Sequence, residues 1–222
     1  HRIIGWEDTL EVLNHATIFS YSDHILTEEY SEDYTNVVIE DIDGDNLLDI
    51  MLILYGRSYG NADAMLIGNY KGGIDVISQY HLKDNITSIN QVKVGKTAEN
   101  EIGIFIDEMS DKQYYTTEVI GLRDKKIVSL LDTNDEEDVD GVAITAITPK
   151  RNLNVLCKDI DYDGILEVPT TEVFQGYDDE NVEEEKMYMT TYYKVSEDSL
   201  VSGTSFAINT DDGYSIKFPD KW

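Results

Sequence analysis

The sequence predicts an all-β fold built from repeated, four-stranded antiparallel units. Three observations predict it. Short apolar runs rich in branched residues are separated by turn residues along the chain, which is typical of buried strands. Two loops with the same spacing of acidic residues each lie between such runs. The pattern also returns at the spacing of a structural repeat, with equivalent positions at residues 41, 93 and 159.

The first two units are expected near residues 1–34 and 35–84. The strands expected in the first unit are 2–6, 16–21 and 25–30. They resemble the closing part of a unit whose beginning is missing. The strands expected in the second unit are 37–40, 50–55, 62–70 and 74–82. Gly72-Gly73 between the last two runs is a hairpin signal, and four strands make one blade-sized sheet.

The next two units are expected near residues 85–140 and 141–210. Their expected strands are 89–94, 101–106, 114–122 and 126–131, then 142–148, 153–157, 186–195 and 205–209. The acidic runs 132–140 and 178–185 are expected to be solvated loops. Residues 211–222 break the repeat, so we expect a linker or the start of a further module there.

Residues 41–49, the first acidic loop, carry acids at positions 1, 3, 5 and 9. Four neighbouring carboxylates repel one another unless a cation lies between them, and calcium takes six to eight oxygen ligands. Gly44 and Asn46 tolerate the positive φ that a tight bend requires. The expected calcium ligands are the side chains of Asp41, Asp43, Asp45 and Asp49 and the backbone carbonyl of Leu47.

Residues 159–167, the second acidic loop, repeat this spacing, with Gly164 at position 6. The expected ligands are the side chains of Asp159, Asp161, Asp163 and Glu167 and the backbone carbonyl of Ile165. The alternative for both loops is a solvated acidic turn, or an Asp-rich turn held by its own side-chain-to-backbone hydrogen bonds.

An EF-hand is excluded for both loops. It requires a glutamate at position 12 and flanking helices, but position 12 is Leu52 or Thr170 and the flanks read as strands. The third unit has Lys93, Gly95 and Thr97 at the positions of the first three acids, so it is not expected to bind calcium. Residues 132–136 lack the glycine and form a weaker third candidate.

The motif D-x-D-G-D-x-x-x-D between two expected strands resembles the FG-GAP/VCBS-type repeats of integrin α-subunit β-propellers and of bacterial surface lipoproteins. This resemblance implies a β-propeller-like array of about three four-stranded blades, either a propeller or a part of one, with calcium bound at one end of a blade. Position by position, it implies the same ligands as above. Glu167 stands where the family usually has Asp, and Asn46 where it commonly has Gly.

Composition limits the classes of partner. The 222 residues carry a formal net charge of −28, with a pI near 4.2. This field repels phosphate backbones and anionic lipids, so nucleic acid is not an expected partner. No apolar run is long enough to insert in a membrane. Cys157 is the single cysteine, and it reads as a small buried residue on a strand.

The resulting hypothesis is a non-catalytic, calcium-binding module for binding or scaffolding, extracellular or at the cell surface, where millimolar calcium fills weak sites. Possible partners are surface proteins or glycans and further domains of the same chain, with a signal or anchor outside this segment. The alternative is a carbohydrate-active or other hydrolytic enzyme. Residues 56–60 match the G-x-S-x-G motif around Ser58, but the helix and downstream histidine that this motif requires are not predicted.

Overall fold

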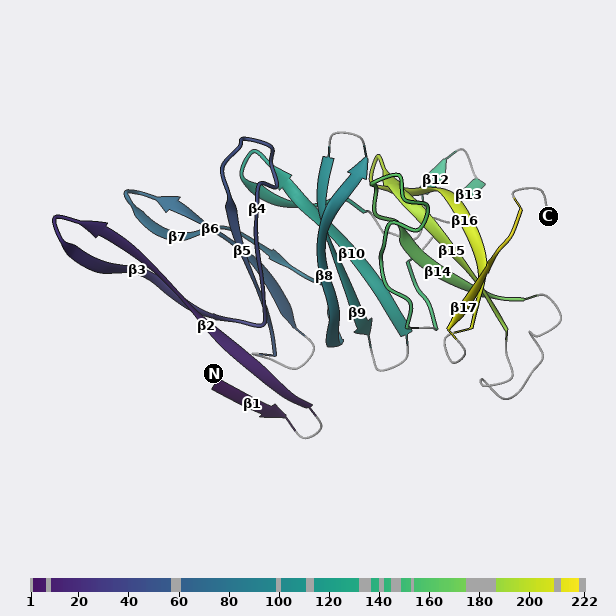
Figure 1. Cartoon of the computed structure of the whole chain (residues 1–222), viewed down its shortest axis with the longest axis horizontal. Helices are drawn as coiled ribbons and strands as arrows, with labels where there is room; N and C mark the ends of the chain where they lie inside the picture. Colours follow the sequence, from purple (N-terminus) through teal and green to yellow (C-terminus); the bar gives the residue numbers. More distant parts are fainter. Residues whose placement is uncertain are drawn as a thin grey trace.

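The computed structural model describes residues 2–6, 9–56, 61–98, 101–110, 114–131, 137–139, 142–144, 149–152, 154–174, 187–209 and 213–219. Within these ranges the regular secondary structure is β-strand, which confirms the predicted all-β class. Three four-stranded sheets and one three-stranded sheet follow one another along the molecule as an open row, and none closes on itself (Figure 1). The described residues include no helix with the length and hydropathy of a membrane span.

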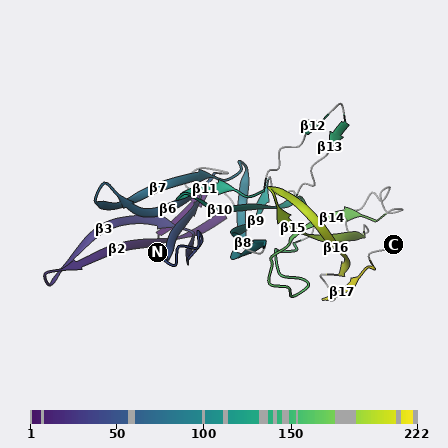
Figure 2. The same ribbon diagram turned by 90° about the horizontal axis from the view of Figure 1, so that it is seen from above.

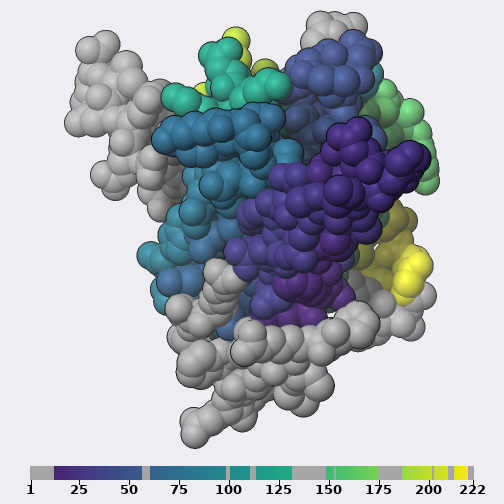
Figure 3. All heavy atoms as spheres, turned by 90° about the vertical axis from the view of Figure 1, so that its left-hand side faces the viewer, coloured from purple at the N-terminus to yellow at the C-terminus, as the bar shows by residue number. Residues whose placement is uncertain are grey.

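The first sheet has three strands and the second has four, each in chain order. The first sheet contains β1 (Arg2–Trp6), β2 (Thr9–Ser22) and β3 (Ile25–Tyr34). The second contains β4 (Asn36–Glu40), β5 (Asp49–Tyr55), β6 (Ala62–Tyr70) and β7 (Gly73–His81). Leu13 packs with Leu52, Leu54 and Met65 between these sheets, and Figure 3 shows the part of the first sheet from residue 13 on (purple) in front of the second (blue).

The third and fourth sheets have four strands each. The third contains β8 (Ile86–Ala98), β9 (Glu101–Ser110), β10 (Tyr114–Arg123) and β11 (Lys126–Ser129). The fourth contains β14 (Val168–Val173), β15 (Tyr188–Ser196), β16 (Ser199–Asn209) and β17 (Tyr214–Lys217). A separate ribbon of β12 (Glu137–Val139) and β13 (Val142–Ile144) projects from the row in Figure 2.

The same hairpin recurs in all four sheets and shows the internal repeat. Two-residue turns join β2 to β3, β6 to β7, β10 to β11 and β15 to β16. Both turn residues have positive φ in every case, and they are Asp23, His24, Lys71, Gly72, Asp124, Lys125, Glu197 and Asp198. Turns of this kind match the right-handed twist of the flanking strands, so they favour tight hairpins.

The third sheet is buried on both faces. Side chains alternate along a strand, so Ile104 and Ile106 of β9 join an apolar cluster shared with the second sheet. Phe105 between them joins a cluster shared with Val168 and Val195 of the fourth sheet. This double burial accounts for the nearly continuous apolar run in β9 and for its central place in the row.

Two expected strand assignments are wrong. Residues 154–157 were expected in a strand, but they form an irregular segment, because side chains of the third sheet rather than a neighbouring strand hold them. Gly95 and Thr97 were expected at loop positions after the strand 89–94, but they lie inside β8, which continues to Ala98 and pairs with β9. Strands β14 and β17 were not predicted, and β12 lies in a run that was expected to be a solvated loop.

Candidate metal centre

The first acidic loop connects β4 to β5 and brings three acids together. One carboxylate oxygen from each of Asp41, Asp43 and Asp49 lies within 4.8 Å of the others. Asp45 is not in this group, and its Oδ2 lies 3.8 Å from Lys125 Nζ. Partial burial raises the pKa of Asp49, and the charge of Asp43 raises it further. These acids therefore form a compact group in which an added positive charge relieves repulsion.

The second acidic loop precedes β14 and brings all four predicted acids together. One carboxylate oxygen from each of Asp159, Asp161, Asp163 and Glu167 lies within 4.8 Å of the others. Burial raises the pKa of Glu167 to about 7, and the charges of Asp161 and Asp163 raise it too. The carbonyls of Ile165 and, in the first loop, Leu47 remain predicted ligands.

The two loops share one backbone conformation. Positions 4 and 6 have positive φ in both, and these residues are Gly44 and Asn46, then Tyr162 and Gly164. The acid at position 9 accepts a hydrogen bond from the N–H at position 2 in both, at 2.9 Å. The N–H at position 6 donates to the acid at position 1 at 3.0 and 2.9 Å. Such bonds also occur in Asp-rich turns, so they establish the repeat but not an ion.

Glu167 carries the observation that a self-bonded acidic turn does not explain. Glu167 is 1% exposed, and its Oε2 accepts a hydrogen bond from the Ile160 N–H at 2.9 Å. Its Oε1 is buried without a hydrogen-bond partner, beside Asp161 and Asp163 of the same acid group. Lys194 Nζ lies 4.0 Å from Oε1, beyond hydrogen-bond distance. A buried carboxylate oxygen without a hydrogen bond is costly, and a cation bound closer among the acids would satisfy it.

Each loop lies against the third sheet. In the second loop, Leu166 N–H donates to Lys96 O of β8 at 2.9 Å, and a methyl group added to Gly95 would come within 2.5 Å of Leu166 Cδ1. The first loop shares an open surface cavity of about 580 Å³ with the β10–β11 turn, lined by Asp43, Gly44, Asp45, Leu122, Asp124 and Lys125. An ion in either loop would therefore also order a junction between sheets.

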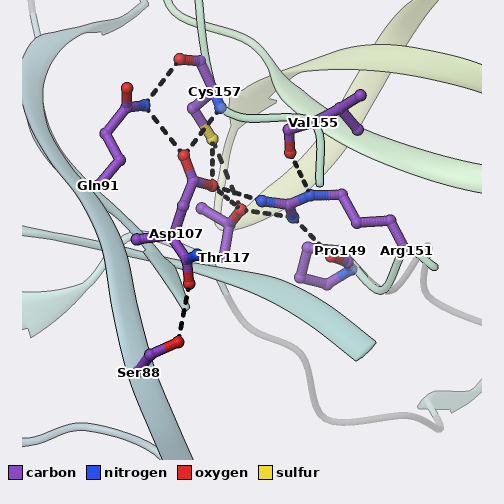
Figure 4. Close-up of polar contacts among 9 residues, drawn as sticks. Ser88, Gln91, Asp107, Thr117, Pro149, Arg151, Val155 and Cys157 are labelled. Carbon is purple, nitrogen blue, oxygen red and sulfur yellow. Dashed lines mark hydrogen bonds and ion pairs between the residues drawn. The ribbon is translucent and has the colours of Figure 1, made fainter. Parts of the chain in front are cut away.

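A buried polar network, shown in Figure 4, joins the third sheet to the segment that leads into the second loop. Arg151 Nη2 lies 2.6 Å from Asp107 Oδ1, and both side chains are fully buried. Thr117 Oγ1 donates a hydrogen bond to Asp107 Oδ1 at 2.7 Å, and the Cys157 N–H donates one to Asp107 Oδ2 at 2.8 Å. Burial raises the pKa of the Cys157 thiol well above its usual value. Because the donors of this network bond the buried Asp107 carboxylate, we interpret the network as structural.

Glu108, the next residue of β9, faces the second sheet. It is 0% exposed, and neither carboxylate oxygen has a hydrogen-bond partner. Glu118 lies near it and accepts the Lys83 N–H at 2.5 Å. Burial raises the pKa of Glu108 well above its usual value, with the charge of Glu118 adding to the effect. Burial also raises the pKa of Glu118. This pair belongs to the core between sheets.

Several predictions fall outside the described residues. They are the serine motif at 57–60, the weaker acidic candidate at 132–136 and the acidic run at 178–185. Sequence reasoning also missed functional neighbours of the loops, above all Lys194, whose Nζ lies 3.6 Å from Asp161 Oδ2. Nothing local to Lys194 marks it, because only strand pairing brings it to the loop.

Comparison with known protein families, with curated proteins and with solved structures finds no match for this chain.

Proposed function

We propose that this chain is a non-catalytic calcium-binding module of repeated β-sheets that serves as a binding or scaffold element, secreted or at the cell surface. The observation that carries the proposal is the second acidic loop. Four acids converge there, and one of them, Glu167, is buried with an oxygen that has no hydrogen-bond partner. The first loop repeats the same backbone with three converging acids.

Calcium suits these groups better than other biological cations. The converging side chains offer carboxylate oxygens and neither imidazole nor thiolate, which disfavours zinc and copper. Calcium accepts six to eight oxygens in flexible geometry, whereas magnesium demands near-ideal octahedra. Asp159, Asp161, Asp163 and Glu167 would hold the ion in the second loop. Asp41, Asp43 and Asp49 would hold it in the first.

The resemblance to FG-GAP/VCBS-type repeats supports a propeller-like arrangement, which we keep as part of the proposal. The ions would stabilise the loops and their junctions with the third sheet, because a ligand that binds only the folded state raises stability by mass action. Weak sites of this kind fill where calcium is millimolar. The proposed partners are surface proteins or glycans and further domains of the same chain.

Thermal unfolding in calcium and in chelator tests the proposal, together with calorimetric titration of calcium. At a calcium concentration 100 times the Kd, each site should add about 2.7 kcal/mol of stability. Asp161→Asn and Asp43→Asn should each remove the contribution of one loop. Asp75→Asn, on an exposed β7 residue, is the control. An unchanged melting temperature in calcium, with no heat of binding, would refute calcium binding.

No specific observation favours the enzyme alternative. That alternative expects two opposed acids in an accessible pocket away from the loops. Glu108 and Glu118 are an acid pair of the described residues away from the loops, but Glu108 is 0% exposed, so a substrate does not reach it. Turnover on a panel of glycans and esters would reverse this preference.

A further inference from the structure

We propose that Lys194 is an internal counter-ion of the second acidic loop, which calcium must displace on binding, so that the first loop fills at lower calcium than the second. This inference rests on the proposed function. It adds that the two loops are unequal and names the residue responsible.

Lys194 Nζ lies within 4.0 Å of three of the acids. It pairs with Asp163 Oδ2, and it lies 3.6 Å from Asp161 Oδ2 and 4.0 Å from Glu167 Oε1. These are three of the four acids that converge in the loop. The ammonium therefore occupies the region where a cation receives the most carboxylate contacts. Calcium cannot bind those same oxygens at about 2.3–2.6 Å while the ammonium stays among them.

Strand pairing accounts for this position. Val168, the first residue after the loop, pairs with Tyr193 of β15. The next residue of β15, Lys194, therefore lies alongside Glu167, the last residue of the loop. A β-bulge in the β15–β16 pairing falls between Tyr193 and Lys194, and bulges re-aim side chains. The Lys194 side chain is 27% exposed, so its flexible stem has a route into solvent when an ion enters.

The first loop has a glycine at the equivalent position. Ile50, the first strand residue after Asp49, pairs with Ile67 of β6. The residue that corresponds to Lys194 is thus Gly68, which has no side chain. Lys125 is the lysine that approaches the first loop, from the third sheet, with a side chain that is 65% exposed and 3.8 Å from Asp45 alone. Among the described residues of the second sheet, no ion pair is therefore made to the converging acids of the first loop.

The test is a Lys194→Met variant of the full chain, with terbium as a luminescent calcium analogue and calcium as its competitor. Tyr162 lies within the second loop and is 91% exposed, whereas residues 41–49 contain no aromatic residue. Tyrosine-sensitised terbium emission should therefore report the second loop, and Tyr162→Phe should remove most of it. Calorimetric titration with calcium follows both loops.

Wild-type protein should show two unequal calcium sites. Lys194→Met should tighten calcium binding at the second loop on the order of tenfold, since a competing charge near three acids is removed. The first loop should be unchanged. Lys194→Arg should behave like wild type because it keeps the charge. Lys217→Met, at an exposed lysine of β17 in the same sheet as Lys194, should leave both sites unchanged.

Thermal unfolding adds a second measurement. In chelator, Lys194→Met should melt below wild type, because the acids lose their counter-ion, and calcium should abolish the difference. An equal loss with and without calcium means that Lys194 is only a structural ion-pair partner and overturns the inference. An unchanged calcium affinity of the second loop in Lys194→Met also overturns the inference. The proposed function stands in that case, because calcium still binds. Absence of metal binding in both proteins removes the proposed function and the displacement together.

Discussion

Replacing Glu108 by glutamine should change how the stability of this protein depends on pH. Glu108 is 0% exposed in the core between the second and third sheets, and neither of its oxygens has a hydrogen-bond partner. Its neighbours there are Glu118 of β10 and Lys83, whose N–H bonds Glu118. Burial holds the pKa of Glu108 well above the ordinary 4.5, so the folded state keeps this proton after the unfolded state has lost it.

The sign follows from proton linkage. Between pH 4.5 and the raised pKa of folded Glu108, the unfolded chain binds fewer protons than the folded chain, so the free energy of unfolding falls as pH rises. One proton corresponds to about 1.4 kcal/mol per pH unit. Below pH 4.5 the contribution of Glu108 is fully present, and it is lost as pH rises toward the folded pKa. Glutamine has nearly the same shape and does not ionise.

Urea unfolding from pH 4 to pH 8 at constant calcium should therefore show Glu108→Gln gaining on wild type by about 1.4 kcal/mol per pH unit above the ordinary carboxyl range. Glu108→Met should also stabilise the protein at neutral pH, by about 1–3 kcal/mol, because it removes a buried unpaired polar group. Glu28→Gln, on an exposed residue of β3, is the control. A wild-type to Glu108→Gln difference that stays constant with pH would show that water reaches the carboxyl and would refute the reasoning.

The remaining predictions concern single contacts and are measured by urea unfolding at fixed pH and calcium. Asp107→Ala should destabilise the protein by about 3–5 kcal/mol because Arg151 stays buried without its partner, and replacing both by Met should recover much of the loss. Gly95→Ala should cost about 1–3 kcal/mol because the methyl group overpacks against the second acidic loop. Gly73→Ala, with nothing within 4 Å of the added methyl group, should be near neutral. Asn46→Ala should cost about 1 kcal/mol because φ is +66°, whereas Asn46→Gly should not. Equal effects at the two glycines, or a neutral Asn46→Ala, would contradict these assignments.

Local signals predicted the parts of the fold that local physics controls. Apolar runs bounded by turn residues located most strands of the first three sheets. The Gly72-Gly73 pair located the β6–β7 hairpin to within one residue, since its turn is Lys71-Gly72. Gly44 and Asn46 were expected at a bend, and both have positive φ. The convergence of Asp41, Asp43 and Asp49 also follows from spacing within one loop.

What sequence reasoning missed depends on contacts between distant residues. Residues 154–157 look like a strand, but the Asp107 carboxylate and Arg151 hold them instead. Strand β9 was expected to end at Ile106, yet it continues to Ser110 with Asp107 and Glu108 buried. Lys194 reaches the second loop only through the pairing of β14 with β15. A one-dimensional pattern carries no information on such pairings.

The third sheet links these observations. Its equivalent of the acidic loops is part of a strand, with Lys93 and Gly95 where the other sheets have acids. It nevertheless contacts both acidic loops, through Lys125 on one side and Lys96 on the other. Its two faces hold the buried acids Glu108 and Asp107 toward opposite neighbours. Glu108 lacks hydrogen-bond partners, whereas Asp107 is paired with Arg151. The junction with the second sheet therefore contains a buried acid without hydrogen bonds, and we expect calcium in the first loop, which lies against the same junction, to matter most there.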